Sequence, residues 1–380
     1  MTISGEKIRT TARRVAAYGA VAVVALAAGA ATFLAVDGPD PAEHRAAPVT
    51  TVTTTPPPTL PASTTTTAAP HDPRRGSGQA VTLAFGGDTH FEAGLHTLVL
   101  RDPDGGFLAP IAPVLGAADV AIVNLETPVT ERGDPVDHQY VFRAPPAAFQ
   151  ALRGAGIDAV TMANNHGGDY GVIGVQDSIA AAEAAGFPVV GIGLDAAQAY
   201  APWRVTVKDQ RIAVIGATDV FEGAVAGNGQ AGVAAARPVE RLLAAVRDAR
   251  ASSDTVLVFM HWGDEGVTCP NVDQRRLERQ LVDAGADIVV GAHAHVQQGA
   301  GRDGSAFVAY GLGNFIWYSE PGDSGRTGVL LVTVTGRDVD SYRWAPARIQ
   351  SGVPRPLDGP AADEAVARWE SLRTCAGLAP

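Results

Sequence analysis

Short apolar runs separated by polar and glycine-rich stretches recur along the chain from about residue 80. Runs of this length that are rich in β-branched and aromatic residues predict buried strands. Two of the runs, residues 203–207 and 211–215, flank a short polar loop and predict a hairpin. The other predicted strands are residues 81–85, 119–123, 158–162, 189–192, 255–260, 288–290, 306–310 and 328–334.

Helical patterns lie between several of these runs, over residues 147–153, 175–185, 238–251 and 274–284. A glycine follows three of them, and Pro238 stands where proline is favoured at the start of the fourth. Strands that alternate with helices predict a layered α/β fold. The hairpin and the close spacing of strands after residue 306 indicate a mixed sheet, and a terminal helix is expected over 361–372.

The N-terminal part of the chain has a different pattern. Residues 15–36 carry no charged side chain, which is long enough for the about 20 residues of a transmembrane helix. Basic residues concentrated in residues 1–14 predict a cytoplasmic tail, so the main domain would lie outside the cell membrane on a single-pass anchor. The alternative is a cleaved signal peptide with a small-residue site at 28–30, although the apolar run exceeds the usual length of about 7–15 residues.

Residues 37–79 are dominated by proline and threonine clusters. Such a composition buries no core, so a disordered linker that stays extended and solvated is expected. The folded domain is predicted to span residues 80–357, followed by a C-terminal helical segment over 358–380.

Charge and cysteine content narrow the classes of function. The formal net charge of -11 gives no electrostatic footprint for nucleic acid. The only cysteines, Cys269 and Cys375, are too few for a disulfide framework or a zinc–thiolate site. In an extracytoplasmic domain they could pair with each other, and the sequence leaves open whether they do.

Potential metal ligands follow the predicted strands, and ligand sites in α/β sheets form beyond the carboxyl ends of strands. Carboxylate, imidazole and amide groups suit Mn, Zn or Fe. The set is too large for one tetrahedral ion, but suits two divalent ions about 3.5–4 Å apart that share a carboxylate. Its members are Asp88, His90, Glu126, Asn165, His261, His293 and His295.

The two histidines of the Gly291–Val296 stretch are one residue apart. Because alternate residues of a strand project to the same side, both imidazoles are expected to converge on one point. Each residue of the set also has a simpler interpretation on its own. Asp88 could cap a turn, Asn165 could occupy a left-handed turn position, and His261 could pack in a core. The recurrence of such residues at strand after strand favours the metal site.

The ordered motifs resemble those of the capsule-synthesis CapA family, the poly-gamma-glutamate synthesis proteins. The resemblance covers residues 80 to about 355, and that family in turn resembles calcineurin-like metallophosphoesterases. It implies a four-layer αββα metallophosphoesterase-like sandwich, preceded here by the transmembrane helix and the disordered linker. The matching motifs are Gly87-Asp88, Asn124-Leu-Glu126-Thr-Pro128, Ala163-Asn-Asn-His166, Asp169-Tyr-Gly171, His261-Trp-Gly263 with Glu265, Gly291-Ala-His293-Ala-His295 and Tyr310-Gly-Leu-Gly-Asn314-Phe315.

The resemblance also implies a role for each residue of the set. His166 would be the catalytic residue, giving a proton to the leaving oxygen or stabilising charge on the phosphate, and Glu265 would orient a ligand histidine. Departures from the family pattern occur at Gly266, Ala294 and Gly311, none of which is an expected ligand. The resemblance implies Asp88, His90 and His295 for a first metal, Asn165, His261 and His293 for a second, and Glu126 as the bridge.

Together these features predict a membrane-anchored, metal-dependent phosphoesterase-like protein in the synthesis of a capsule or poly-gamma-glutamate surface polymer. Its expected partners are the surface polymer or its phosphorylated precursor, the membrane, and a polymer-synthesis complex. The alternative is a non-catalytic component of a complex that exports or attaches the polymer, because a fold does not fix a reaction. The acidic balance of the chain gives no attraction for an anionic polymer, so the metals would have to supply it.

Overall fold

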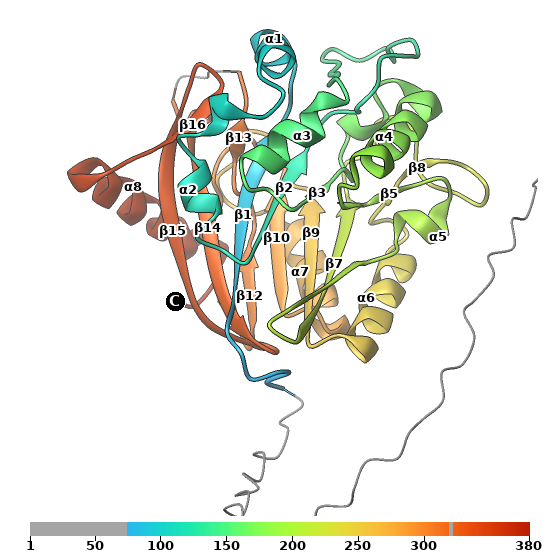
Figure 1. Ribbon diagram of the computed structural model, residues 1–380. Helices are drawn as coiled ribbons and strands as arrows, with labels where there is room; N and C mark the ends of the chain where they lie inside the picture. Colours follow the sequence, from blue (N-terminus) through green and yellow to red (C-terminus); the bar gives the residue numbers. More distant parts are fainter. Residues whose placement is uncertain (1–73, 319–321) are drawn as a thin grey trace, which may run out of the picture. The chain divides into compact units, whose positions relative to one another are not determined.

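Two β-sheets lie face to face in the computed structural model, which describes residues 74–318 and 322–380 (Figure 1). The predicted cytoplasmic tail, the anchor and most of the predicted linker lie outside these residues. Within them, no helix combines the length and the apolar character needed to cross a membrane.

The first sheet has eight strands in the order β16-β15-β14-β1-β2-β3-β4, with β13 paired to β1. The strands β1 to β4 run parallel to one another, whereas β14, β15 and β16 are joined to them and to one another by antiparallel pairing. Its strands are β1 (Val81–Thr89), β2 (Val120–Leu125), β3 (Ala159–Thr161), β4 (Val189–Val190), β13 (Asn314–Ile316), β14 (Arg326–Thr335), β15 (Asp338–Gln350) and β16 (Val353–Pro356).

The second sheet has six strands in the order β11-β12-β10-β9-β7-β6, of which β12, β10, β9 and β7 are parallel. The predicted hairpin forms β6 and β7, and its two loop residues, Lys208 and Asp209, both have positive φ. The strands are β6 (Trp203–Val207), β7 (Gln210–Thr218), β9 (Thr255–His261), β10 (Ile288–Ala292), β11 (Ala300–Asp303) and β12 (Ala306–Ala309); β5 (Ile192–Gly193) and β8 (Gly232–Val233) form a separate pair.

Helices cover the outer face of each sheet (Figure 1). On the first sheet lie α1 (Gly94–Arg101), α2 (Ala112–Leu115), α3 (Ala147–Gly154) and α4 (Gly171–Ala185), and on the second lie α6 (Glu240–Ser252) and α7 (Val272–Ala284). The remaining helices are α5 (Ala196–Ala199), α8 (Gly359–Ser371), α9 (Arg373–Ala376) and the short 3-10 helices Gly106–Leu108 and His166–Gly168.

Three hydrophobic cores separate these layers, and strand alternation explains them. Along β9, Leu257 and Phe259 face the other sheet, whereas Val256 and Val258 face α6 and α7. Successive residues of a strand point to opposite sides, so a strand covered on both faces is apolar throughout. Phe85 of β1 meets Phe259 edge to face, with ring centroids 6.4 Å apart. The layered, mixed α/β architecture predicted from the sequence is confirmed.

Some predicted boundaries were wrong. The run 189–192 is not one strand, because Gly191 has a φ of +81° and divides it into β4 and β5, which belong to different sheets. The helix expected to begin at Pro238 begins at Glu240. By contrast α7 begins before the predicted Gln274, because Asn271 and Gln274 form a capping box that starts the helix at Val272.

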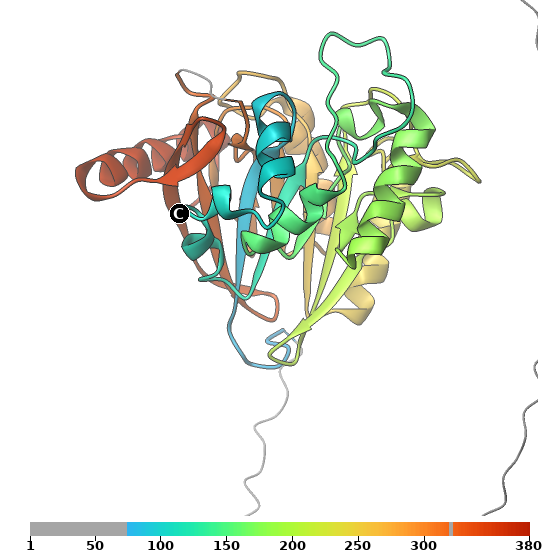
Figure 2. The ribbon, with the colours of Figure 1, turned by 45° about the horizontal axis from the view of Figure 1, so that its top comes forward.

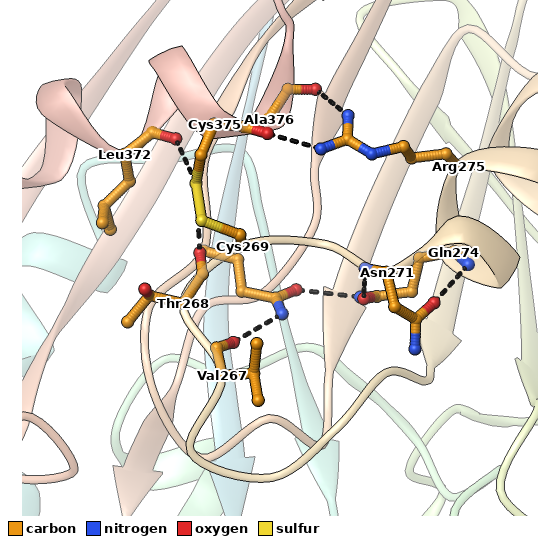
Figure 3. Close-up of a disulfide and its surroundings, with 10 residues drawn as sticks. Val267, Thr268, Cys269, Asn271, Gln274, Arg275, Leu372, Cys375 and Ala376 are labelled. Carbon is orange, nitrogen blue, oxygen red and sulfur yellow. Dashed lines mark hydrogen bonds between the residues drawn. A yellow bond between two sulfur atoms is a disulfide. The ribbon is translucent and has the colours of Figure 1, made fainter.

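A disulfide joins Cys269, in the loop that follows β9, to Cys375 in α9 (Figure 3). The sequence had left this pairing open. The same contact is reinforced by Arg275, whose guanidinium donates to the carbonyl oxygens of Cys375 and Ala376. The C-terminus is therefore fastened to the loop that carries Glu265.

Replacement of both cysteines by serine is expected to lower the free energy of unfolding by about 2–5 kcal/mol, because the bridge closes a long loop in the unfolded chain. The two cysteines are 106 residues apart in sequence. Urea denaturation of the wild type, with and without a reductant, and of the double variant would measure it. Equal unfolding midpoints in all three samples would contradict this expectation.

Glu278, a buried residue of α7, predicts that the free energy of unfolding depends on pH. Glu278 is 2% exposed, accepts a 3.3 Å hydrogen bond from the Tyr310 hydroxyl, and burial together with the charge of Asp303 raises its pKa from 4.5 to about 7. The folded state therefore favours the protonated form of Glu278. The resulting contribution to the free energy of unfolding is complete below pH 4.5 and is lost as the pH rises towards 7. We expect the Glu278→Gln variant not to lose stability over this pH range. Denaturation measured as a function of pH would test this, and the same pH dependence in both proteins would show that Glu278 contributes nothing.

Candidate metal centre

The carboxyl ends of parallel strands from both sheets meet at one edge of the fold. In Figure 1 the strands β1 and β2 point upward to this edge. Asp88 lies near the end of β1, and Glu126 directly follows β2. From the second sheet, His261 ends β9, and His293 follows β10. The structure therefore brings together side chains that are far apart in the sequence.

A bulge in β1 aligns Asp88 with the neighbouring strand. The register between β1 and β2 shifts between Phe85 and Asp88, which places Asp88 opposite Asn124. Bulges often redirect side chains beside functional sites. Glycine is required at position 87, because an added Cβ would lie 1.7 Å from the carbonyl oxygen of Gly313. This explains the glycine directly before Asp88.

Glu126 is the central carboxylate of the site. It is fully buried, and within the described chain neither of its carboxylate oxygens has a hydrogen-bond partner. Its Oε1 lies 3.4 Å from Nε2 of His261 and 3.9 Å from Nε2 of His295. Burial, followed by the negative charge of Asp88, raises the pKa of Glu126 well above its usual range. A buried carboxylate without hydrogen bonds is unfavourable unless a cation binds it.

His261, Asn165 and His293 form one group of donors next to Glu126. Nε2 of His261 lies 2.7 Å from Oδ1 of Asn165 and 3.1 Å from Nδ1 of His293. Burial lowers the pKa of His261 well below its usual range and that of His293 to about 4, so both rings are neutral. Neutral imidazole is the form that binds metals.

Asp88 and His295 form a second group beside Glu126. Nδ1 of His295 lies 3.2 Å from Oδ2 of Asp88 and 2.8 Å from Oδ1 of Asn314. Burial is the largest effect and lowers the pKa of His295, but the hydrogen bond and charge of Asp88, together with Glu265 and Asn314, outweigh it, so the net pKa is raised. Metal binding at this group therefore competes with protonation of His295.

The two histidines after β10 do not converge by strand alternation, so that expectation was wrong in its mechanism. The strand ends at Ala292, and both His293, with φ of +92°, and His295, with φ of +54°, have left-handed backbone conformations. Such conformations are unfavourable for residues other than glycine and are concentrated at functional sites. A strained turn brings the two rings together, with centroids 5.9 Å apart.

His90 is absent from the two sets of three donor residues whose atoms converge within 4.8 Å in the described chain. These sets cut across the two groups above, and they are Glu126 with His293 and His295, and Asp88 with Glu126 and His261. Its Nδ1 accepts a 3.0 Å hydrogen bond from the backbone N–H of Glu92. Its ring stacks on Phe142 at 4.7 Å and meets Trp317 edge to face at 4.2 Å. The role of His90 as a metal ligand therefore stays a prediction, whereas its aromatic surroundings are observed.

His166 reaches the site from the 3-10 helix that follows β3. Its Nδ1 lies 2.8 Å from Oδ2 of Asp169, which also accepts a 2.7 Å hydrogen bond from the backbone N–H of Phe142. Phe142 belongs to the long connection between β2 and α3, which projects above the helices in Figure 2. Asp169 thus fixes both the orientation of His166 and the position of this connection.

Two asparagines that the ligand set omitted orient its members. The amide of Asn124 donates to Oδ1 of Asp88 at 2.8 Å and lies 3.1 Å from Nδ1 of His261. Asn164 in turn donates to Asn124 at 3.0 Å. Both were visible in the sequence as the asparagines that follow the second and third strands. Partners of this kind orient metal ligands.

Glu265 does not make the contact expected of it. Its side chain is exposed, and within the part of the chain that the structure describes it makes no hydrogen bond to a ligand histidine. It instead lines a cavity of about 210 Å³ together with His166, His295 and Asn314. Tyr310, Asn314 and Phe315 are all buried, and of these three Asn314 lines the cavity.

The residues present fit a centre for divalent cations. Lone pairs of carboxylate, imidazole and amide groups approach within about hydrogen-bonding distance, and within the described chain both oxygens of Glu126 lack donors. This donor chemistry suits Mn, Zn or Fe. The fold and the site thus define a layered α/β protein with a candidate metal centre at the shared edge of its sheets.

The chain belongs to the family of the bacterial capsule synthesis protein PGA_cap, whose sequence profile matches residues 82–319. It is 29% identical over 289 residues to the capsule biosynthesis protein CapA of Bacillus anthracis, covering 73% of this chain and 70% of that protein. It is 32% identical over 211 residues to the PGA biosynthesis protein CapA of Bacillus subtilis, covering 54% of this chain and 55% of that one. A probable polyglutamine synthesis accessory protein of Mycobacterium tuberculosis is 32% identical over 191 residues, covering 47% of this chain and 50% of its own.

Solved structures also align with the chain. The 5'-nucleotidase precursor from Thermus thermophilus has a TM-score of 0.45 and 15% sequence identity, and the alignment covers 77% of this chain and 59% of that one. A hypothetical protein from the same organism has a TM-score of 0.44 and 19% identity, and the alignment covers 73% of this chain and 100% of its own.

Proposed function

We propose that this protein is a membrane-anchored, extracytoplasmic phosphoesterase-like enzyme with two divalent metal ions, which acts in the synthesis of a capsule or poly-gamma-glutamate surface polymer. The observation that carries the proposal is the buried carboxylate of Glu126, which has no hydrogen-bond partner in the described chain and is flanked by His261 and His295. The names of the two CapA relatives support the link to a surface polymer. The uncharged segment 15–36 supports the anchor.

The donor groups suggest how two ions would be held. Asn165, His261 and His293 would hold one, Asp88 and His295 the other, and Glu126 would contribute to both. When bound, such ions acidify a water molecule and offset the charge of a phosphate ester. Nδ1 of His90 accepts from the N–H of Glu92 and its Nε2 is 3.4 Å from the N–H of Tyr318, so His90 would complete the second group only if one of these contacts were given up.

The residues of the chain would supply the remaining chemistry. His166 lines the cavity above the donors, where its Nε2 could give a proton to the departing alkoxide oxygen as the P–O bond breaks. Asp169 holds the opposite nitrogen of that ring and so fixes its orientation. Asn124 keeps the Asp88 carboxylate and the His261 ring in register.

Metal analysis of the purified full-length protein, followed by assays with phosphomonoesters and phosphodiesters, tests this proposal. We expect about two equivalents of Mn, Zn or Fe per chain, as a two-metal site requires. Hydrolysis should depend on the metal and disappear after chelation. If the protein neither binds metal nor gains activity on reconstitution with metal, the proposed enzymatic function is excluded.

A second function, a non-catalytic component of a polymer export or attachment complex, has one observation in its favour. The mycobacterial relatives are named as accessory proteins. Bound metal without turnover, together with a His166→Ala variant that still supports polymer assembly in cells, would favour this function.

Protease added to intact cells should digest the main domain if the anchor has the proposed orientation.

A further inference from the structure

The cavity above the candidate metal centre has an aromatic wall. Nine described residues line its volume of about 210 Å³, and four of them are Tyr140, Phe142, Trp317 and Tyr318. Phe142 and Trp317 are each 4% exposed and meet at right angles, with ring centroids 5.5 Å apart. Tyr140 is 58% exposed. The wall therefore combines a rigid buried part with an accessible rim.

The cavity has few charged side chains of fixed sign in its lining. Among its nine described lining residues there is one acidic side chain, Glu265, and none is lysine or arginine. The ring of His90 packs behind the wall against Phe142, Trp317 and Tyr318. If a substrate carried an anionic group in addition to its phosphate, that group would find no lysine or arginine among these lining residues.

Glu265 acts on His295 and Glu126 through its charge, but within the described residues it makes no hydrogen bond. Its side chain is exposed, and within the same part of the chain its carboxylate forms no ion pair. A carboxylate beside several aromatic rings is the arrangement that recognises ammonium groups, because the rings attract a cation with their π faces. The loop that carries Glu265 is fixed in place by the Cys269–Cys375 disulfide, so the carboxylate is held near the cavity.

The cavity also reaches the reacting groups. His166, His295 and Asn314 line it together with the aromatic residues. A phosphate group at the donor residues would therefore place the alcohol part of its ester in the aromatic part of the cavity. From this geometry we infer that the preferred substrate is a phosphate ester of an amino alcohol, with its ammonium group held by Tyr140, Trp317, Tyr318 and Glu265. This inference rests on the proposed phosphoesterase function.

Hydrolysis of such an ester consumes one water molecule. Its oxygen forms a bond to phosphorus, the P–O bond to the amino alcohol breaks, and the alkoxide takes up a proton. The products are phosphate and the free amino alcohol, and no oxidant or further reactant is needed.

Calorimetric binding to the full-length, Mn²⁺-loaded protein tests the inference with two ligands of equal shape. Phosphocholine carries a trimethylammonium group, and 3,3-dimethylbutyl phosphate carries a neutral tert-butyl group in its place. We expect phosphocholine to bind about 3- to 30-fold more tightly, the range of a partly desolvated cation–π contact. Equal affinities, or tighter binding of the neutral ester, would overturn the inference.

Two variants locate the preference. Glu265→Gln and Tyr140→Leu, both at exposed positions, should each reduce the ratio of the two affinities by about threefold or more. The matched control Glu364→Gln, an exposed residue of α8, should leave the ratio unchanged. An unchanged ratio in both test variants would remove the assignment to this cavity. If no ester is hydrolysed, the proposed function fails, yet the binding ratio still decides whether the cavity prefers an ammonium group.

Discussion

Replacing Glu126 by glutamine should lower the affinity for divalent metal by about 100-fold or more, because even the loss of an outer partner of a metal ligand costs about 10–100-fold. Glu126 lies within reach of both donor groups, so its loss weakens both. Hydrolytic activity should fall with the metal content. Metal analysis after dialysis, together with calorimetric titration of the metal-free protein, would measure the loss.

The same substitution should leave the metal-free protein at least as stable as the metal-free wild type. Burial and Asp88 raise the pKa of Glu126, so the folded state favours its protonated form, and stability is lost as the pH rises above its usual value. A neutral glutamine does not ionise and so avoids this loss of stability. Comparison of the thermal unfolding of the two metal-free proteins at pH 8 would detect the difference. Glu278→Gln is the matched control, since it removes another buried carboxylate and should retain the metal. If Glu126→Gln keeps full metal affinity, Glu126 is not the bridge.

Sequence reasoning found the elements whose burial leaves a clear pattern. The apolar strands β1, β2, β9 and β10 were predicted because both of their faces are covered. The long strand β15 was not, because its exposed and buried positions are interrupted by charged and polar residues throughout Asp338–Gln350. Helix α1 was missed as well, since it has no side-chain cap and begins at a glycine.

For the candidate site, strand order predicted that residues from separate strands lie together, but not how their side chains are arranged. Parallel strand ends converge by topology, so Asp88, Glu126 and His261 could be grouped before the structure was known. The strained turn at His293 could not be foreseen, because a left-handed backbone depends on the surrounding fold. The contact of His90 with Trp317 joins residues far apart in sequence, and no local pattern encodes it.

Replacing His166 by alanine should reduce the hydrolysis of alkyl phosphate esters by about 10²–10⁴-fold, the usual contribution of a positioned general acid. The metal content should not change, because His166 belongs to neither group of converging donors. Asp169→Asn should have a smaller effect, about 10–100-fold as for other orienting partners, because it loosens the 2.8 Å contact with Nδ1 while leaving the ring in place.

The leaving group distinguishes the two roles of His166. The 4-nitrophenolate of a 4-nitrophenyl ester leaves without needing a proton, whereas the alkoxide of an alkyl ester leaves poorly unless it is protonated. If His166 is the acid, its removal should slow the alkyl ester at least tenfold more than the 4-nitrophenyl ester, within the range that proton transfer contributes. Equal losses for both esters would show instead that His166 stabilises charge on the phosphate. Unchanged turnover of both would remove His166 from the reaction, and the orientation by Asp169 would then serve only to hold the connection that carries Phe142.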